Sequence, residues 1–172
     1  QQVQASAGWV NEILQSKRTV YGINTGFGIL AHTAIDPKDA NTLQHKILES
    51  HSVGVGNPVS AEIVRLMLIT KLQSLAYGHS GVQPKTLERI LWHLENDALP
   101  VVPEKGSVGA SGDLAPLAHL FLPLIGLGEV VWKGERMETA KMLNQTGLVP
   151  LKLGPKEGLA LINGTQFILA HA

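Results

Sequence analysis

The 172-residue sequence contains no cysteine, which excludes disulfides, thiolate metal ligands and a cysteine nucleophile. A chain without thiols fits a reducing compartment, and we expect a cytoplasmic protein. Net charge is absent too, because 14 Lys and Arg residues balance 14 Asp and Glu residues. No charge field is therefore present to recruit nucleic acid or an anionic membrane. The apolar share of 44% is enough for a hydrophobic core.

Long hydrophobic runs and targeting segments are missing as well. The longest apolar run, residues 114–127, is too short to cross a bilayer and is interrupted by Pro116, His119 and Pro123. The first residues, Gln-Gln-Val-Gln, lack the basic segment of a signal peptide. There is no initiator Met, and the chain stops inside an apolar segment without a helix-ending signal. We therefore expect a piece of a longer protein, with no membrane partner.

Proline, serine and glycine divide the sequence into segments whose apolar spacing is mostly helical. Residues 63–69 are apolar nearly all round and predict a deeply buried helix centre. In the helix that Pro84 opens, leucine and isoleucine recur at helical spacing and place His93 on the solvent side. Residues 99–103 are expected to form an extended linker. Helices are also predicted over residues 2–16, 37–52, 60–77 and 139–147, in a short stretch from Pro155, and after a break at 163–165.

One small β-hairpin is predicted over residues 129–137, turning at Lys133-Gly134. No internal repeat or low-complexity tract is present. The predicted fold class is mainly α, with glycine-rich loops and this single hairpin.

Residues 105–114 form a glycine-rich stretch around the tripeptide Ala110-Ser111-Gly112. Asp113 and Pro116 follow, an order typical of a tight loop that leads into a helix start. Free N–H groups of that helix would make the loop electropositive, and such a place can stabilise an anion or sharpen an electrophile. The alternative is a plain glycine-rich connector before a capped helix.

Other patterns carry weaker chemistry. Residues 26–31 match a relaxed dinucleotide pattern, but the required alternation of strand and helix is missing. Ser111 beside Asp113 suggests a serine hydrolase only distantly, because Gly112 follows the serine directly and the nucleophile elbow is absent. No histidine pair has the spacing of a helical zinc site, so no metal is expected.

Three further residues each have two interpretations. His119, inside an apolar run, is either a hydrogen-bonded core histidine or a base. Tyr21, between glycines in a loop, is either a proton carrier or a packing aromatic. Asn163, before Gly164, is either a helix cap or a functional amide.

Three separated blocks together resemble the aromatic amino-acid ammonia-lyases. They are residues 21–28 (Tyr-Gly-Ile-Asn-Thr-Gly-Phe-Gly), residues 106–119 (Gly-Ser-Val-Gly-Ala-Ser-Gly-Asp-Leu-Ala-Pro-Leu-Ala-His) and residues 161–166 (Leu-Ile-Asn-Gly-Thr-Gln). Within that family the whole chain is similar to the N-terminal part of the histidine ammonia-lyases. The resemblance implies the helical fold shared with fumarase and aspartase, and an enzyme that is a carbon–nitrogen lyase.

The resemblance also implies a self-made prosthetic group. The amide nitrogen of Gly112 attacks the carbonyl carbon of Ala110, and Ser111 loses its hydroxyl to leave an exocyclic methylene. Two waters depart, and the product is 4-methylidene-imidazol-5-one (MIO), an electrophile that replaces any external cofactor. A Cβ at position 112 would crowd the attacking nitrogen, so the family pattern requires glycine there. The substrate amine or its ring then adds to the methylene carbon, a base removes the β-proton, and ammonia leaves.

Residue roles follow from the same resemblance. Tyr21 is the expected base, although an acidic residue later in the family could share the task. Asn163 corresponds to the asparagine near the substrate carboxylate and the MIO oxygen. Where phenylalanine and tyrosine lyases carry Phe-Leu or His-Leu, this chain has Ser50-His51, as histidine lyases do. His51 would hydrogen-bond the substrate imidazole, which implies L-histidine as substrate and urocanate as product.

Alternatives within and outside this family stay open: a phenylalanine or tyrosine lyase or aminomutase, and a catalytically silent domain that keeps the fold. The family's carboxylate-pairing arginine, a second tyrosine and a late glutamate would lie beyond these residues, and family sites combine several subunits of a homotetramer. We expect a single N-terminal piece: residues 1–104 form the first helices and tyrosine loop, 105–128 the MIO loop and its helix, and 129–172 the hairpin and first central helices. Alone, this piece is expected to be inactive.

Overall fold

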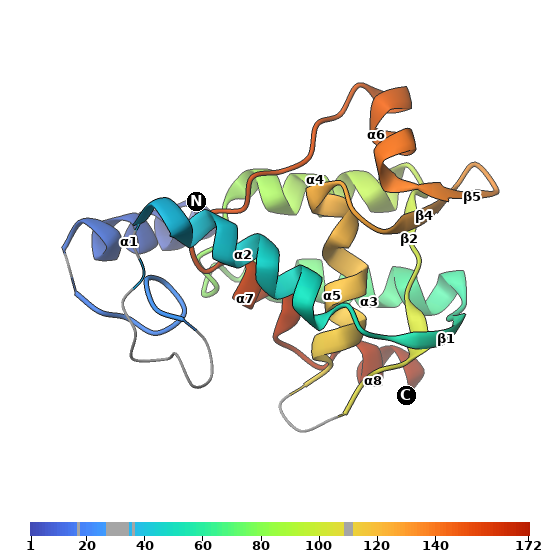
Figure 1. Ribbon diagram of the computed structural model, residues 1–172, viewed down its shortest axis with the longest axis horizontal. Helices are drawn as coiled ribbons and strands as arrows, with labels where there is room; N and C mark the ends of the chain where they lie inside the picture. Colours follow the sequence, from blue (N-terminus) through green and yellow to red (C-terminus); the bar gives the residue numbers. More distant parts are fainter. Residues whose placement is uncertain (17, 27–34, 36, 109–111) are drawn as a thin grey trace.

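The computed structural model describes residues 1–16, 18–26, 35, 37–108 and 112–172. Helices dominate it, joined by short strands and turns (Figure 1). The helices are α1 (Gln2–Gln15), α2 (Pro37–His51), α3 (Ala61–Ala76), α4 (Pro84–Glu95), α5 (Leu114–Phe121), the 3₁₀ turn η2 (Leu122–Ile125), α6 (Thr139–Thr146), α7 (Glu157–Ile162) and α8 (Gln166–His171). The strands are β1 (Val55–Pro58), β2 (Leu99–Pro100), β3 (Pro103–Lys105), β4 (Glu129–Trp132) and β5 (Glu135–Glu138).

α5 lies at the centre of the fold, where it runs through the middle of Figure 1. It packs against α2, α7 and α8. Leu117, Ala118 and Phe121 have no exposed surface, as the apolar run after the glycine-rich stretch predicts. Because α5 begins at Leu114, the end of that stretch is tied to the middle of the core.

Helix boundaries follow the local signals closely. The Ser60 hydroxyl accepts a hydrogen bond from Ile63 N–H and caps α3, as its sequence position predicts. Pro84 is the first residue of α4, and Gly147 ends α6 in the left-handed region. The mainly α fold is therefore confirmed.

Two expectations about helix faces are wrong. Leu66 and Ile69 of α3 are 45% and 49% exposed, because α1, α4 and α8 cover only part of this helix. His93 is buried rather than on the solvent side, and its Nδ1–H donates to the Ala98 carbonyl at 2.7 Å. Burial lowers the pKa of His93 to about 4, so the ring is neutral.

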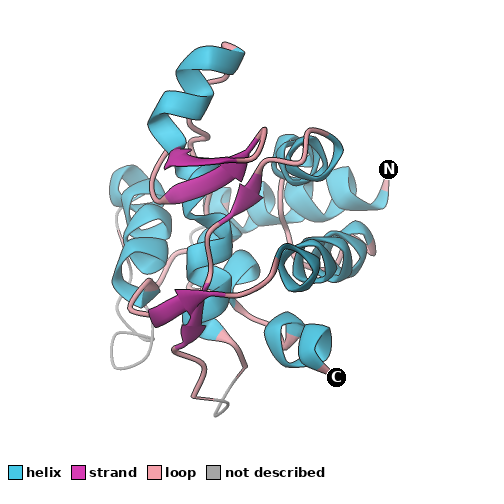
Figure 2. Ribbon diagram, turned by 90° about the vertical axis from the view of Figure 1, so that its right-hand side faces the viewer, coloured by secondary structure: helices cyan, strands magenta, loops and turns pink. Residues whose placement is uncertain are grey.

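The strands form two small antiparallel sheets, which Figure 2 shows as separate groups. The β4–β5 hairpin is confirmed, with Lys133 and Gly134 at its turn, both at positive φ. The linker expected over residues 99–103 instead contributes β2 to the hairpin sheet, and β3 pairs with β1. Proline at positions 100 and 103 suits such short edge strands, since an edge position needs no N–H donor.

Packing produces a large core around α5 and a smaller cluster of the hairpin with α6. Within the described ranges, every helix is too short or too polar for a membrane crossing.

Candidate active site

Gly112 is the described residue of the predicted tripeptide, while Ala110 and Ser111 lie outside the described residues. Its φ is +113°, a conformation that L side chains rarely adopt. A Cβ on Gly112 would lie 2.5 Å from the Gly164 carbonyl oxygen. The backbone after the tripeptide therefore meets the turn between α7 and α8 at a distance that only glycine allows, which fits the glycine that MIO formation requires.

Asp113 fixes this meeting point from inside the core. Its N–H donates to the Gly164 carbonyl at 2.8 Å. One carboxylate oxygen accepts from the Ser107 hydroxyl at 2.8 Å, and the other accepts from the N–H groups of Phe167 and Ile168 at 3.0 Å each. The side chain is fully buried. Asp113 thus precedes α5 but caps the first turn of α8, where a negative charge is favourable.

Asn163 ends α7 and precedes this turn. Its side chain is exposed, while its carbonyl oxygen accepts a hydrogen bond of 2.5 Å from Lys71 Nζ on α3. The residue is not the N-cap of the following helix, because Thr165 holds that position. Asn163 is thus not the cap that begins α8, but it is the C-cap of α7. Its side-chain amide is exposed.

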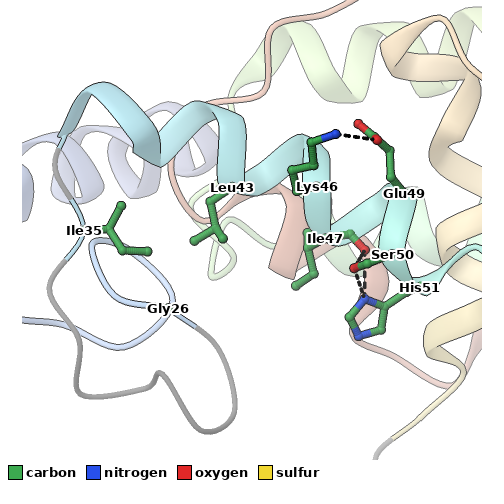
Figure 3. A pocket seen from close by; sticks show the side chains of 8 residues that line it. All are labelled: Gly26, Ile35, Leu43, Lys46, Ile47, Glu49, Ser50 and His51. Atoms are coloured by element: carbon green, nitrogen blue, oxygen red, sulfur yellow. Dashed lines mark hydrogen bonds and ion pairs between the residues drawn. The ribbon is translucent and has the colours of Figure 1, made fainter.

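His51 is the last residue of α2, and its ring orientation is fixed by the helix. Nδ1 lies 2.9 Å from the Ile47 carbonyl oxygen and 3.1 Å from the Ser50 hydroxyl (Figure 3). Because a carbonyl oxygen only accepts, Nδ1 carries the proton. Nε2 is then an acceptor, and it lies on the side of the ring away from the helix.

Two cavities meet at Ser50 and His51. The smaller, about 210 Å³, extends from them to Gly112 and is otherwise lined by Val53, Gly106, Val108, Leu114 and Ala115. The larger, about 550 Å³, lies on the other side along α2 and reaches Gly26 and Ile35 of the tyrosine loop (Figure 3). The structure therefore brings His51 and Gly112, the described residue of the predicted tripeptide, together in one mostly apolar cavity.

Tyr21 does not line either cavity, and its side chain is 54% exposed. Its loop is nevertheless tied to the site, because Gly22, at φ +74°, packs so closely on Leu159 of α7 that a Cβ would clash. The dinucleotide pattern at residues 26–31 extends into residues 27–34, which lie outside the described residues.

His119 is a hydrogen-bonded histidine at the edge of the core. Its Nε2 accepts from Gly54 N–H at 3.0 Å, and burial lowers the pKa of the ring. The same contact fixes the chain two residues after Ser52, close to the end of α2. Among the described residues, no three histidines, aspartates or glutamates are grouped as metal ligands.

Sequence reasoning considered Asp113 only at the helix start and beside Ser111, not as the link to α8, and it missed Lys71 altogether. A signal for Lys71 existed: it shares a helical face with Met67, Leu68 and Leu75, all buried. Two partners of the Asp113 carboxylate and the partner of Lys71 had no such signal, because Phe167 and Ile168 lie 54 and 55 residues from Asp113 and Asn163 lies 92 residues from Lys71.

Comparison with known proteins places these features in one family. The family model described as aromatic amino acid lyase matches residues 1–172. The histidine ammonia-lyase of Symbiobacterium thermophilum is 51% identical over 170 residues, which are 99% of this chain and 34% of that protein. The histidine ammonia-lyase of Geobacillus thermodenitrificans is 50% identical over 168 residues, 98% of this chain and 33% of the relative. The chain thus spans about a third of the length of these curated relatives.

Among solved structures, the tyrosine aminomutase of Streptomyces globisporus superposes with a TM-score of 0.89 at 38% identity. The match covers 98% of this chain and 32% of the aminomutase. The backbone therefore resembles that of an enzyme whose name gives tyrosine, not histidine, as its substrate.

Proposed function

Because this chain belongs to the aromatic amino acid lyase family, we propose that it is part of an enzyme that eliminates ammonia from L-histidine to give urocanate. The observation that carries the choice of substrate is the His51 ring. Its Nδ1–H is used by the Ile47 carbonyl, so Nε2 is the acceptor available to a ligand in the cavity that ends at Gly112. An imidazole N–H of histidine can donate to it, whereas the phenylalanine ring has no donor. The tyrosine hydroxyl can donate as well, so the substrate comparison below separates histidine from tyrosine.

When formed from residues 110–112, MIO supplies an electrophilic carbon to this cavity. The chain's own residues bind and orient the substrate beside it. His51 Nε2 holds the imidazole, and the exposed Asn163 amide donates to the substrate carboxylate. Leu114 and Ala115 line the cavity with apolar surface and reduce the water around these hydrogen bonds.

Tyr21 is the proposed proton acceptor, with its phenolic oxygen taking the β-proton. Tyr21 is exposed and lies outside the two cavities, and we propose that further parts of the full-length enzyme complete the site around it. This agrees with the proposal of a homotetramer that shares its sites between subunits. The cytoplasmic location and the division at residues 104 and 128 stay predictions.

The test compares substrates in the proposed full-length enzyme. Urocanate formation is followed by its ultraviolet absorbance, and cinnamate and coumarate formation from phenylalanine and tyrosine in the same way. We expect histidine to be the preferred substrate, and His51→Leu to lower kcat/KM for histidine by about 100-fold or more. The matched control is His79→Leu, which removes an exposed histidine away from the cavities.

Two outcomes would reject the proposal. Preference of the unmodified enzyme for phenylalanine or tyrosine would favour the lyase or aminomutase alternative, which the likeness to the tyrosine aminomutase keeps in view. No turnover of any of the three, with an intact mass lower by two waters, would favour a silent domain. The 172-residue chain alone is proposed to be inactive, and urocanate formation by the purified chain would contradict that.

A further inference from the structure

We propose that Lys71 is a positioning residue for ammonia elimination, which acts by holding the Asn163–Gly164 turn against the active-site loop; this inference rests on the proposed function. Lys71 lies on the inner face of α3 and has no exposed surface. Its Nζ donates to the Asn163 carbonyl oxygen at 2.5 Å. The residue does not touch the cavities and is therefore not a catalytic residue.

A buried amino group with these surroundings is costly for the fold when it is charged. The ion pairs found among the described residues all lie at the surface, and none includes Lys71. Burial lowers the pKa of Lys71 to about 7, because the charged form loses its hydration. A methionine would fill the same space without this cost, so packing alone does not account for a lysine here.

The position of the hydrogen bond indicates what the ammonium does. Lys71 holds the carbonyl of Asn163 from one side, and the Asp113 N–H holds the carbonyl of Gly164 from the other. Two successive peptide groups are thus fixed by donors from different parts of the core. With both carbonyls held, the side chain of Asn163 is directed outward, and Gly164 stays in contact with Gly112.

The charge also suits this place electrostatically. Asn163 caps the carboxyl end of α7, where the helix carries partial negative charge. The Lys71 amino group donates to this last carbonyl in either protonation state, and the hydrogen bond is stronger when the group is charged. Lys71 therefore makes the end of α7 rigid at the residue that the proposed reaction uses.

The experiment is a double-mutant cycle in the proposed full-length enzyme. We expect Lys71→Met to lower kcat for histidine by about 10- to 100-fold with little change in folding. In the Asn163→Ala background, the same substitution should cost less than about twofold, because the residue through which Lys71 acts is already gone. Lys71→Arg keeps a cationic donor and should recover most of the lost rate.

Lys156→Met is the matched control. Lys156 Nζ also donates to a backbone carbonyl, that of Ser80 at 2.6 Å, and burial also lowers its pKa. It should leave kcat unchanged in both backgrounds. Equal losses from Lys71→Met with and without Asn163, or a kcat equal to that of the unmodified enzyme, would overturn the proposal.

A readout independent of activity separates this inference from the proposed function. Hydrogen exchange of the Asp113, Phe167 and Ile168 amides should accelerate by about tenfold or more in Lys71→Met and stay unchanged in Lys156→Met. If the unmodified enzyme fails to convert histidine, the proposed function falls, and this exchange result alone judges Lys71. Unchanged exchange of these amides in Lys71→Met would then overturn the proposed role of Lys71. If Lys71→Met misfolds, Lys71→Arg decides: failure of Lys71→Arg to restore the protection of these amides would also overturn the role.

Discussion

Each end of α7 is held by hydrogen bonds to a buried ionisable side chain, but the two ends have different roles. At the amino end, the buried Glu157 carboxylate accepts from Gln83 N–H, Thr86 hydroxyl and Gly154 N–H at 2.6–2.9 Å. At the carboxyl end, the buried Lys71 amino group donates to the Asn163 carbonyl. The Glu157 carboxylate, and the Lys71 amino group when charged, each oppose the partial charge of their helix end. Glu157 belongs to α7 and contacts distant residues, whereas Lys71 reaches α7 from α3.

The two ends of α7 differ in whether a side chain stays exposed to a ligand. Glu157 is fully buried and its partners are all part of the scaffold, so that end is closed. Asn163 keeps an exposed side chain, and the next residue touches Gly112 beside the smaller cavity. A short helix can therefore be anchored rigidly at one end to place functional groups at the other. Substitutions at the first end should change stability, and those at the second should change chemistry.

The largest expected effect comes from removing the Asp113 carboxylate, which supports the carboxyl end. Asp113→Ala leaves the Phe167 and Ile168 N–H groups without their acceptor and loosens the turn that Gly112 contacts. In the proposed full-length enzyme we expect no loss of two waters from residues 110–112 and at least about 1000-fold less urocanate formation, equal to about 4 kcal/mol. Intact mass spectrometry and the absorbance assay measure these effects.

Asp113→Asn is the conservative companion to that variant, since it keeps the size of the side chain and one carbonyl acceptor. It should condense partly, between the unmodified chain and Asp113→Ala. Complete condensation in Asp113→Ala would break the comparison, because the carboxyl end would then have no special part in the chemistry.

The next effect is on stability alone, at the amino end. Glu157→Ala removes three hydrogen bonds to a buried carboxylate and should lower the free energy of unfolding by about 3 kcal/mol or more. The activity of the folded full-length variant should stay near that of the unmodified enzyme. Urea unfolding measures the free energy of unfolding. The matched control is Glu88→Ala, at an exposed position of α4, which should change this free energy by less than about 0.5 kcal/mol. A selective loss of activity in folded Glu157→Ala would show that both ends serve the site.

A smaller effect is the pH dependence that Lys71, at the carboxyl end of α7, gives to the free energy of unfolding. The pKa of Lys71 is about 7 in the folded chain and 10.5 without burial, so between these values the unfolded state binds more protons. The free energy of unfolding should therefore rise with pH across this window, by up to about 1.4 kcal/mol per pH unit, and lose this slope below about pH 7. Urea unfolding of Lys71→Met should show a flatter pH dependence in the window. The same slope in both proteins would mean that Lys71 keeps its charge when folded.

The sequence predicts well what depends on neighbouring residues. Pro37, Ser60 and Pro84 begin helices in the structure because capping and proline geometry act within one turn. The hairpin turn at Lys133-Gly134 is equally local. By contrast, β1 and β3 pair across about fifty residues, from Val55 to Lys105, and neither segment has a strong strand pattern.

The candidate site shows the same contrast between features that the sequence predicts and features that depend on distant residues. The family blocks predicted Tyr21, Gly112 and Asn163, and the Ser50-His51 pair predicted His51. The structure brings His51 and Gly112 to one cavity. The buried charges that hold these residues escaped prediction, since the partner of a buried ammonium or carboxylate is set by packing and not by spacing. The position of His93 was predicted wrongly for a related reason: the Ala98 carbonyl, after a turn of the chain, accepts from Nδ1–H and stabilises the buried ring at that nitrogen.

The smallest expected effect tests whether burial, and not charge itself, gives the α7 contacts their strength. Arg136 and Glu129 form a two-pronged ion pair on the hairpin, with both side chains exposed. Hydrogen bonding to Arg136 lowers the pKa of Glu129, yet water and salt screen such a pair. Arg136→Gln should therefore lower the free energy of unfolding by less than about 1 kcal/mol, and about 1 M salt should remove most of the difference. A loss as large as that of Glu157→Ala would mean that hydrogen-bond geometry outweighs burial, and the contrast between the helix ends would need another explanation.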